Sequence, residues 1–271
     1  MVTPVNQRKK GYAAEMMRQL VWHVKMYDPL ACAVTLYSEV GSYYTRCGFS
    51  IPFGYTVPQC ILFPPLSSSE EYQQQQQQGR DEVVSLTEIK ESDPDAEEKW
   101  EQVKAFNRVK LSGSLFLECP FSKVPVFWVA NDSFPPACPL PKALGCTAIR
   151  KDPTTGQTVA EATLFWVPFK FDKVLDVALI AGTDPQCLTA LIKEARRVAG
   201  VECQLALGVR LWLDPDCWLA SSSSSKGKIE EAEWVIANNG IMSTRKEIPF
   251  ISVIRGLKSP DSWRFIPRVI C

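Results

Sequence analysis

A basic turn containing a glycine stands close to the start of the sequence and leads directly into a helical pattern. It reads RKKGYA over residues 8–13. The glycine and the small side chain two positions later allow backbone N–H groups to face outward at a helix start, where aligned peptide dipoles favour an anion. The turn therefore predicts a diphosphate site, although a basic turn that caps a surface helix would have the same sequence. The candidate binding residues are Arg8, Lys9, Lys10, Gly11, Tyr12 and Ala13.

The residues after the turn predict a helix, a strand and a second short helix. Apolar residues recur at three- and four-residue steps over residues 13–25, which predicts a helix with one buried face. The residues expected on that face are Met16, Met17, Leu20, Val21 and Val24. Residues 31–37 form an apolar run typical of a strand. The second helix is expected to carry Tyr43 and Tyr44 and to stop at Gly48.

This order of elements resembles the second half of a domain of the GNAT superfamily of acetyl-CoA-dependent N-acetyltransferases. In that superfamily an RxxGxG/A signature binds the pyrophosphate of coenzyme A, and a later YxxxGF element places a tyrosine near the thioester sulfur. Arg8, Gly11 and Ala13 match the first element, and the sequence YTRCGF over Tyr44–Phe49 matches the second. The resemblance implies acetyl-CoA as the cofactor and Tyr44 as the catalytic residue.

Tyr44 also has a chemical argument in its favour. When an amine attacks a thioester, the departing thiolate is better released as a thiol, and a phenol can donate that proton. The spacing of four residues to Gly48 selects Tyr44 rather than its neighbour Tyr43. The alternative is that Tyr44 is a core side chain with its hydroxyl hydrogen-bonded inside the protein.

A narrower resemblance rests on the stretch LYSEVGSYYTRCGF and on a long C-terminal extension rich in Trp and Phe. Both are similar to the fungal lysine N6-acetyltransferases of lysine degradation. This resemblance implies an enzyme that transfers acetyl from acetyl-CoA to a primary amine, the N6-amine of free lysine. Because only Met1–Asn6 precede the turn, we expect an N-terminally truncated acetyltransferase half, in which no general base can be named. The competing interpretation is a noncatalytic remnant or a partner-binding α/β protein.

Composition limits the other classes of partner. Lys plus Arg and Asp plus Glu number 30 each, so neither nucleic acid nor an anionic membrane is expected as a partner. No apolar run reaches the roughly 20 residues that span a bilayer, and no signal segment is visible, which favours a cytoplasmic location. The ten cysteines form no CxxC pair and His23 is the single histidine, so no metal site is predicted.

A polar low-complexity tract divides the chain. Residues 64–82 contain a run of Pro and Ser followed by six consecutive glutamines, and such a segment cannot bury enough apolar surface to fold. We therefore expect residues 1–63 to form the acetyltransferase half, residues 64–82 to be a linker, and residues 83–271 to form a second domain.

The second domain is expected to repeat the element order of an acetyltransferase domain. Its helices are predicted near residues 97–111, from 185 onward and over 229–239, and its strands over 145–150, 159–167, 173–180, 204–207 and 250–254. The whole chain is thus predicted to be an α/β (α+β) protein with mixed sheets and flanking helices.

The second copy is expected to be degenerate and noncatalytic. Its turn Gly182–Cys187 lacks the extra glycines, and Asp184 would repel a diphosphate. Ile236 stands at the position that matches Tyr44. This domain either covers the groove of the first and helps to bind the acceptor, or serves as a packing platform without ligand contact.

Overall fold

The structure is a computed structural model, and it describes residues 10–28, 33–38, 41–50, 59–66, 84–110, 139–169, 172–213, 235, 237–244 and 248–253. The chain divides into two compact units that are discontinuous in sequence. Unit 1 comprises Met1–Val57, Gly113–Leu115 and Thr244–Phe265. Unit 2 comprises Pro58–Ser112, Phe116–Ser243 and Ile266–Cys271.

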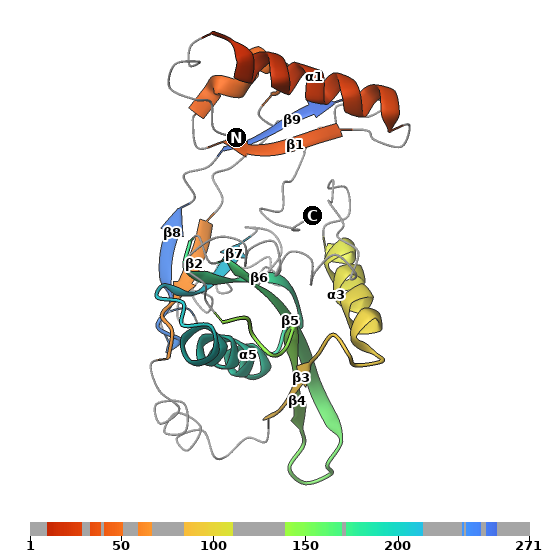
Figure 1. The fold of residues 1–271 in the computed structure, drawn as a ribbon. Coiled ribbons are helices and arrows are strands. Elements are labelled where there is room, and N and C mark those ends of the chain that lie inside the picture. The colour runs from red at the N-terminus through yellow and green to blue at the C-terminus, as the bar shows by residue number, and fades with distance from the viewer. Residues whose placement is uncertain are drawn as a thin grey trace, which may run out of the picture. The chain divides into compact units, whose positions relative to one another are not determined.

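The described part of unit 1 contains two helices and a two-stranded antiparallel sheet (Figure 1). Its elements are α1 (Tyr12–Tyr27), β1 (Ala33–Ser38), the 3₁₀ helix η2 (Gly41–Cys47) and β9 (Ile248–Val253). Strands β1 and β9 pair over their full lengths, with Ala33 opposite Val253 and Ser38 opposite Ile248. Strand β9, from near the end of the sequence, therefore belongs to the same unit as the N-terminal residues.

The core of unit 1 is small. Its buried members are Ala14, Met17, Cys47 and Phe49, and Val21, Val34, Tyr43 and Tyr44 pack against them. Of the residues predicted on the buried face of the first helix, Met17 is buried and Val21 is partly buried. The prediction that Met16 and Leu20 are buried is wrong, because they are 47% and 45% exposed. The described part of unit 1 covers only one side of a helix whose apolar residues extend further around it.

Unit 2 is built on a seven-stranded mixed sheet in the order β3-β4-β5-β6-β7-β2-β8. The strands are β2 (Gln59–Phe63), β3 (Val84–Ile89), β4 (Gly145–Lys151), β5 (Thr158–Phe169), β6 (Val174–Ala181), β7 (Gly208–Leu213) and β8 (Ile241–Thr244). Strands β6 and β7 pair in parallel over three residue pairs only, from Val174 opposite Gly208 to Asp176 opposite Arg210. The pairs β3–β4, β4–β5, β5–β6 and β2–β7 are antiparallel.

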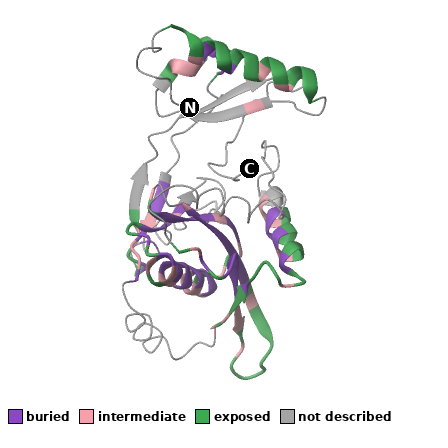
Figure 2. Ribbon diagram, in the orientation of Figure 1, coloured by how far each residue is buried: buried purple, intermediate pink, exposed green. Residues whose placement is uncertain are grey.

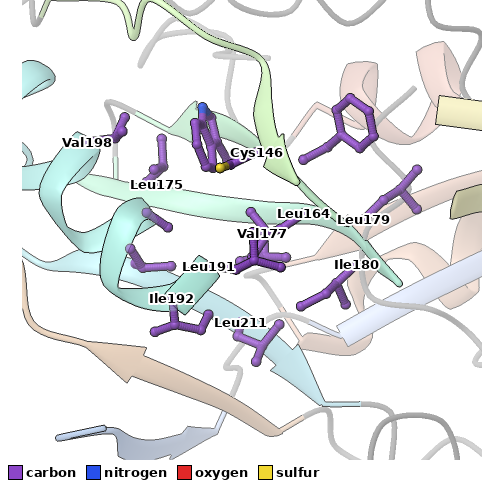
Figure 3. Packing of buried hydrophobic residues seen from close by; sticks show 14 of the residues in the cluster. Cys146, Leu164, Leu175, Val177, Leu179, Ile180, Leu191, Ile192, Val198 and Leu211 are labelled. Carbon is purple, nitrogen blue, oxygen red and sulfur yellow. The ribbon is translucent and has the colours of Figure 1, made fainter. Parts of the chain in front are cut away.

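The helices α3 (Ala96–Lys110) and α5 (Pro185–Arg197) belong to this unit, and α5 continues as a π-helical turn over Val198–Glu202. Figure 2 shows that buried residues concentrate on the sheet and on the face of α5 that packs on it. In Figure 3 the side chains of Leu191 and Ile192 from α5 lie among those of Val177 and Leu211 from the sheet. One continuous apolar core thus holds unit 2 together.

The predicted α/β class, with mixed sheets and flanking helices, is confirmed. The predicted helices and the strands over 145–180 agree with α1, α3, α5 and β4–β6 to within a few residues. The strand predicted over 204–207 is wrong, because Gln204 and Gly208 adopt φ values of +54° and +83° and the strand begins only at residue 208. The sequence analysis did not find β2, β3 or β8.

The limits of the two units differ from the predicted segments. Residues 59–63, assigned to the first segment, form β2 and pair with β7 in unit 2. Residues 248–253, assigned to the second, form β9 and pair with β1 in unit 1. Strand pairing between distant segments sets these limits, and a composition change along the chain carries no information about it. Most of the predicted helix over 229–239 lies outside the described residues.

Candidate functional site

Helix α1 begins directly after the glycine of the predicted turn. Gly11 precedes the helix in the left-handed region, at φ +84°, where a glycine has no steric penalty. Among the described residues no side chain caps this helix start, and a Cβ added at Gly11 would meet nothing within 4 Å. The first N–H groups of a helix have no partner within the helix, and such groups can bind an anion.

The side chains of the turn are placed only in part. Lys10 and Tyr12 are exposed, and Ala13 is half-buried. Arg8 and Lys9 lie outside the described residues. The described portion of the motif thus offers one cation and an uncapped helix start on the surface of unit 1.

Tyr44 lies on η2 and is half-buried. Its ring packs edge-on against Tyr43 and Phe49, with centroid distances of 5.2 and 6.2 Å. The same core includes Ala14, which lies in the first turn of α1. The structure therefore brings the glycine turn and the tyrosine element, some thirty residues apart in sequence, to one small core.

The spacing of the tyrosine element has a structural cause. Gly48 ends the 3₁₀ helix at φ +86°, which a non-glycine residue adopts at a cost. The Phe49 N–H then donates to the carbonyl oxygen of Tyr44, at 3.3 Å, and the Phe49 ring is buried. Gly48 and Phe49 thus fix the turn that follows Tyr44. The neighbouring Tyr43 faces the guanidinium of Arg46, which lies 5.0 Å from the ring centroid.

The corresponding turn of unit 2 is closed. Asp184 caps α5 by accepting a hydrogen bond from the Cys187 N–H at 2.9 Å, and Arg150 donates to its other oxygen at 2.8 Å. Gly182 leaves no room either, because a Cβ there would lie 2.5 Å from the Cβ of Ala162. The carboxylate of Asp184 thus binds an N–H group at the start of α5, where an external anion would otherwise accept it. Ile236, the counterpart of Tyr44, lies outside the described residues.

Asp184→Ala is expected to lower the free energy of unfolding of unit 2 by about 0.5–2 kcal/mol at neutral pH, the usual contribution of an N-cap. Burial raises the pKa of Asp184, but the hydrogen bonds from Cys187 and Arg150 together bring that pKa below its ordinary value. A carboxylate with a lowered pKa stabilises the fold above its unfolded pKa of about 3.9, and this contribution is lost as the pH falls through the folded value.

Urea unfolding of wild type and variant between pH 7 and pH 3 measures this contribution. The difference in stability should be largest near neutrality and should shrink below about pH 4. Thr183→Ala, at the exposed neighbouring position, is the matched control. A difference that persists unchanged at pH 3 would show that the Asp184 charge is not responsible.

The sequence analysis missed a buried ion pair at the joint between β6 and β7. Arg210 donates through Nε and Nη2 to both carboxylate oxygens of Asp176, at 2.5 and 2.9 Å, and through Nη1 to Asp172 at 2.7 Å. The available signal was a single charge inside each of two apolar strand patterns, VLDVALIA and GVRLWL. Charges at such positions indicate mutual pairing across neighbouring strands.

Two of the described cysteines are held as thiols by burial. The free and buried cysteines include Cys146 and Cys187. Burial raises the pKa of Cys146 to about 12 and that of Cys187 to about 11, so both are thiols at neutral pH. Within the described ranges, no three His, Cys, Asp or Glu side chains group as metal ligands would. The helices described here include none long and apolar enough to cross a membrane.

Comparison with known proteins gives distant structural neighbours only. No protein-family model matches the chain, and no curated protein sequence matches it. Eis1 from Mycobacterium abscessus aligns with 7% identity and a TM-score of 0.37, over 94% of this chain and 55% of that one. This chain therefore spans about half the length of Eis1. The C-terminal domain (DUF2156) of a protein described as a lysylphosphatidylglycerol synthetase, from Agrobacterium fabrum, aligns with 14% identity and a TM-score of 0.36, over 88% and 73% of the two chains. These scores are too low to assign a function.

Proposed function

We propose that this chain is an acetyl-CoA-dependent N-acetyltransferase whose cofactor site lies in unit 1 and whose acceptor is a primary amine, the N6-amine of free lysine. One observation carries the proposal: the uncapped, left-handed glycine start of α1 and the tyrosine element of η2 share one core. The matching turn of unit 2 is filled by Asp184, so unit 2 is assigned no cofactor.

Two roles are assigned to residues of this chain, binding of the diphosphate and donation of one proton. Acetyl-CoA, when bound, supplies an activated acetyl group on a thioester. The first amides of α1 would hold the diphosphate, with charge added by Lys10 and by Arg8 and Lys9 of the motif. As the neutral acceptor nitrogen forms its bond to the acetyl carbon and the carbon–sulfur bond breaks, Tyr44 would give its phenolic proton to the sulfur, and the tyrosinate would regain a proton from the new amide nitrogen. The ammonium form of the acceptor must first lose a proton, and we assign no residue to that step.

Thermal unfolding with and without excess acetyl-CoA tests the cofactor site. A ligand at a hundredfold over its Kd adds about 2.7 kcal/mol, and we expect a matching rise in the midpoint of unit 1. Gly11→Glu should abolish the rise, because it forces a side chain into the left-handed region and places a negative charge where the diphosphate binds.

Gly156→Glu is the matched control. Gly156 also has a positive φ, +69°, and open space around it, but it lies in the exposed turn between β4 and β5 of unit 2. This variant should keep the full response to acetyl-CoA. Tyr44→Phe should also keep the response, while acetyl transfer to lysine falls by about 10²-fold or more. A folded wild-type chain that does not respond to acetyl-CoA would leave the noncatalytic, partner-binding interpretation.

A further inference from the structure

Arg46 of η2 differs from four other arginines in what its guanidinium contacts. A carboxylate of the protein pairs with each of Arg18, Arg150, Arg197 and Arg210. Arg46 is exposed, and its guanidinium lies over the ring of Tyr43, with 5.0 Å between the guanidinium carbon and the ring centroid. Among the described residues no carboxylate pairs with Arg46. A planar guanidinium can stack on a ring and still present its N–H groups to an external anion.

The 3₁₀ helix places this cation close to the candidate proton donor. Residues three apart in a 3₁₀ helix lie one above the other, which explains why Arg46 meets Tyr43. The ring of Tyr43 is in turn almost perpendicular to that of Tyr44, at 87°, with a centroid distance of 5.2 Å. Because the distances of 5.0 and 5.2 Å meet at the Tyr43 centroid, the guanidinium carbon lies no more than about 10 Å from the centroid of the Tyr44 ring.

This separation fits an acceptor that has a carboxylate at one end and an amine at the other. In an extended lysine about 7 Å separate N6 from the carboxyl carbon. The carboxyl and guanidinium carbons of an ion pair lie about 4 Å apart. A lysine held through its carboxylate by Arg46 can therefore bring N6 to the ring of Tyr44, the residue proposed to protonate the leaving sulfur. Arginine also suits this task, because its planar fork donates two parallel hydrogen bonds to a carboxylate.

We propose that Arg46 binds the carboxylate of the acceptor, so that the chain selects a free amino acid with a terminal amine. A diamine lacks that carboxylate, and a lysine within a peptide has an amide in its place, so both are poorer acceptors. The inference rests on the proposed function. A phosphate group of acetyl-CoA is the second possible source of an anion for Arg46, and a comparison of acceptors distinguishes the two.

Rates of acetyl transfer to three acceptors test the proposal. Lysine and 6-aminohexanoate carry a carboxylate at the same distance from a terminal amine, whereas 1,5-diaminopentane is lysine without its carboxyl group. Arg46→Gln should lower kcat/KM for lysine and 6-aminohexanoate at least tenfold, because a charged hydrogen bond is lost. The value for 1,5-diaminopentane should change less than about twofold, which also shows that the variant is folded.

Two further variants serve as controls. Arg46→Lys keeps the charge but not the planar fork, so it should recover part of the lost kcat/KM for lysine. Arg18→Gln removes another exposed arginine of unit 1, one that already pairs with Glu15, and should act on all three acceptors like wild type.

Calorimetric titration with lysine in the presence of coenzyme A measures recognition without turnover. The Kd for lysine should rise at least tenfold in Arg46→Gln and stay unchanged in Arg18→Gln. Equal losses with all three acceptors, or a raised KM for acetyl-CoA alone, would overturn the proposal and assign Arg46 to the fold or to the cofactor. Unchanged lysine binding and transfer in Arg46→Gln would also overturn it and leave the proposed function standing. Lysine binding that depends on Arg46 but leads to no transfer would contradict the proposed function alone.

Discussion

Arg210→Met is expected to destabilise unit 2 by about 3–5 kcal/mol, the cost of leaving a buried carboxylate without its partner. The carboxylate is that of Asp176, whose side chain is 1% exposed. Arg210 contacts both oxygens of Asp176 and one oxygen of Asp172. Methionine retains much of the apolar stem that lies near Phe169 but none of these hydrogen bonds.

The position of this pair enlarges the expected effect. Strands β6 and β7 are joined by only three residue pairs, and Asp176 opposite Arg210 is the last of them. This short parallel joint connects the four strands β3-β4-β5-β6 to the three strands β7-β2-β8. A loss of charge pairing there weakens the connection between two parts of one sheet rather than a single contact.

Urea unfolding followed by circular dichroism measures the effect, and a double variant is its control. Arg210→Met combined with Asp176→Leu removes both charges, so most of the lost stability should return. A cost of less than about 1 kcal/mol for the single variant would indicate a pair that behaves as solvent-exposed. A double variant no more stable than the single one would assign the cost to lost packing.

The elements that depend on the pattern of neighbouring residues were predicted from the sequence. The apolar periodicity of α5, with Pro185 at its start, and the strands of the β4–β5–β6 meander were found from neighbouring residues alone. Strand partners could not be found in this way. β2 and β9 pair with strands more than a hundred residues away in sequence, and no composition change marks either pairing.

The candidate site was predictable to a similar extent. Gly11 and Gly48, the glycines of the two motifs, both have left-handed φ values, a conformation that glycine adopts without steric penalty. The exposure of Leu20 was not predictable, because periodicity shows how wide an apolar face is but not how much of it the fold covers. The capping role of Asp184 was visible in part, since an Asp before Pro is a helix-start signal as well as a charge.

Replacing Phe250 and Ile251 together by proline is expected to unfold unit 1 and to abolish its response to acetyl-CoA. These positions pair with Leu36 and Thr35 in the middle of β1. Adjacent residues of a strand direct their N–H groups to opposite edges, so one of the two prolines removes a hydrogen bond of the ladder whichever edge faces β1. A two-stranded sheet is marginal by itself, and among the described strands only β1 and β9 form this sheet.

Hydrogen exchange measured by mass spectrometry separates the two units in this variant. Amides of residues 33–38 should lose their protection, while those of residues 174–181 in β6 should keep it, because β6 pairs with β5 and β7. Phe250→Tyr with Ile251→Val, which retains every backbone donor, is the control and should respond to acetyl-CoA like wild type. Retention of the acetyl-CoA response in the proline variant would show that the cofactor site does not depend on β9. Loss of protection in both units would show instead that they unfold together, with β9 stabilising the whole chain.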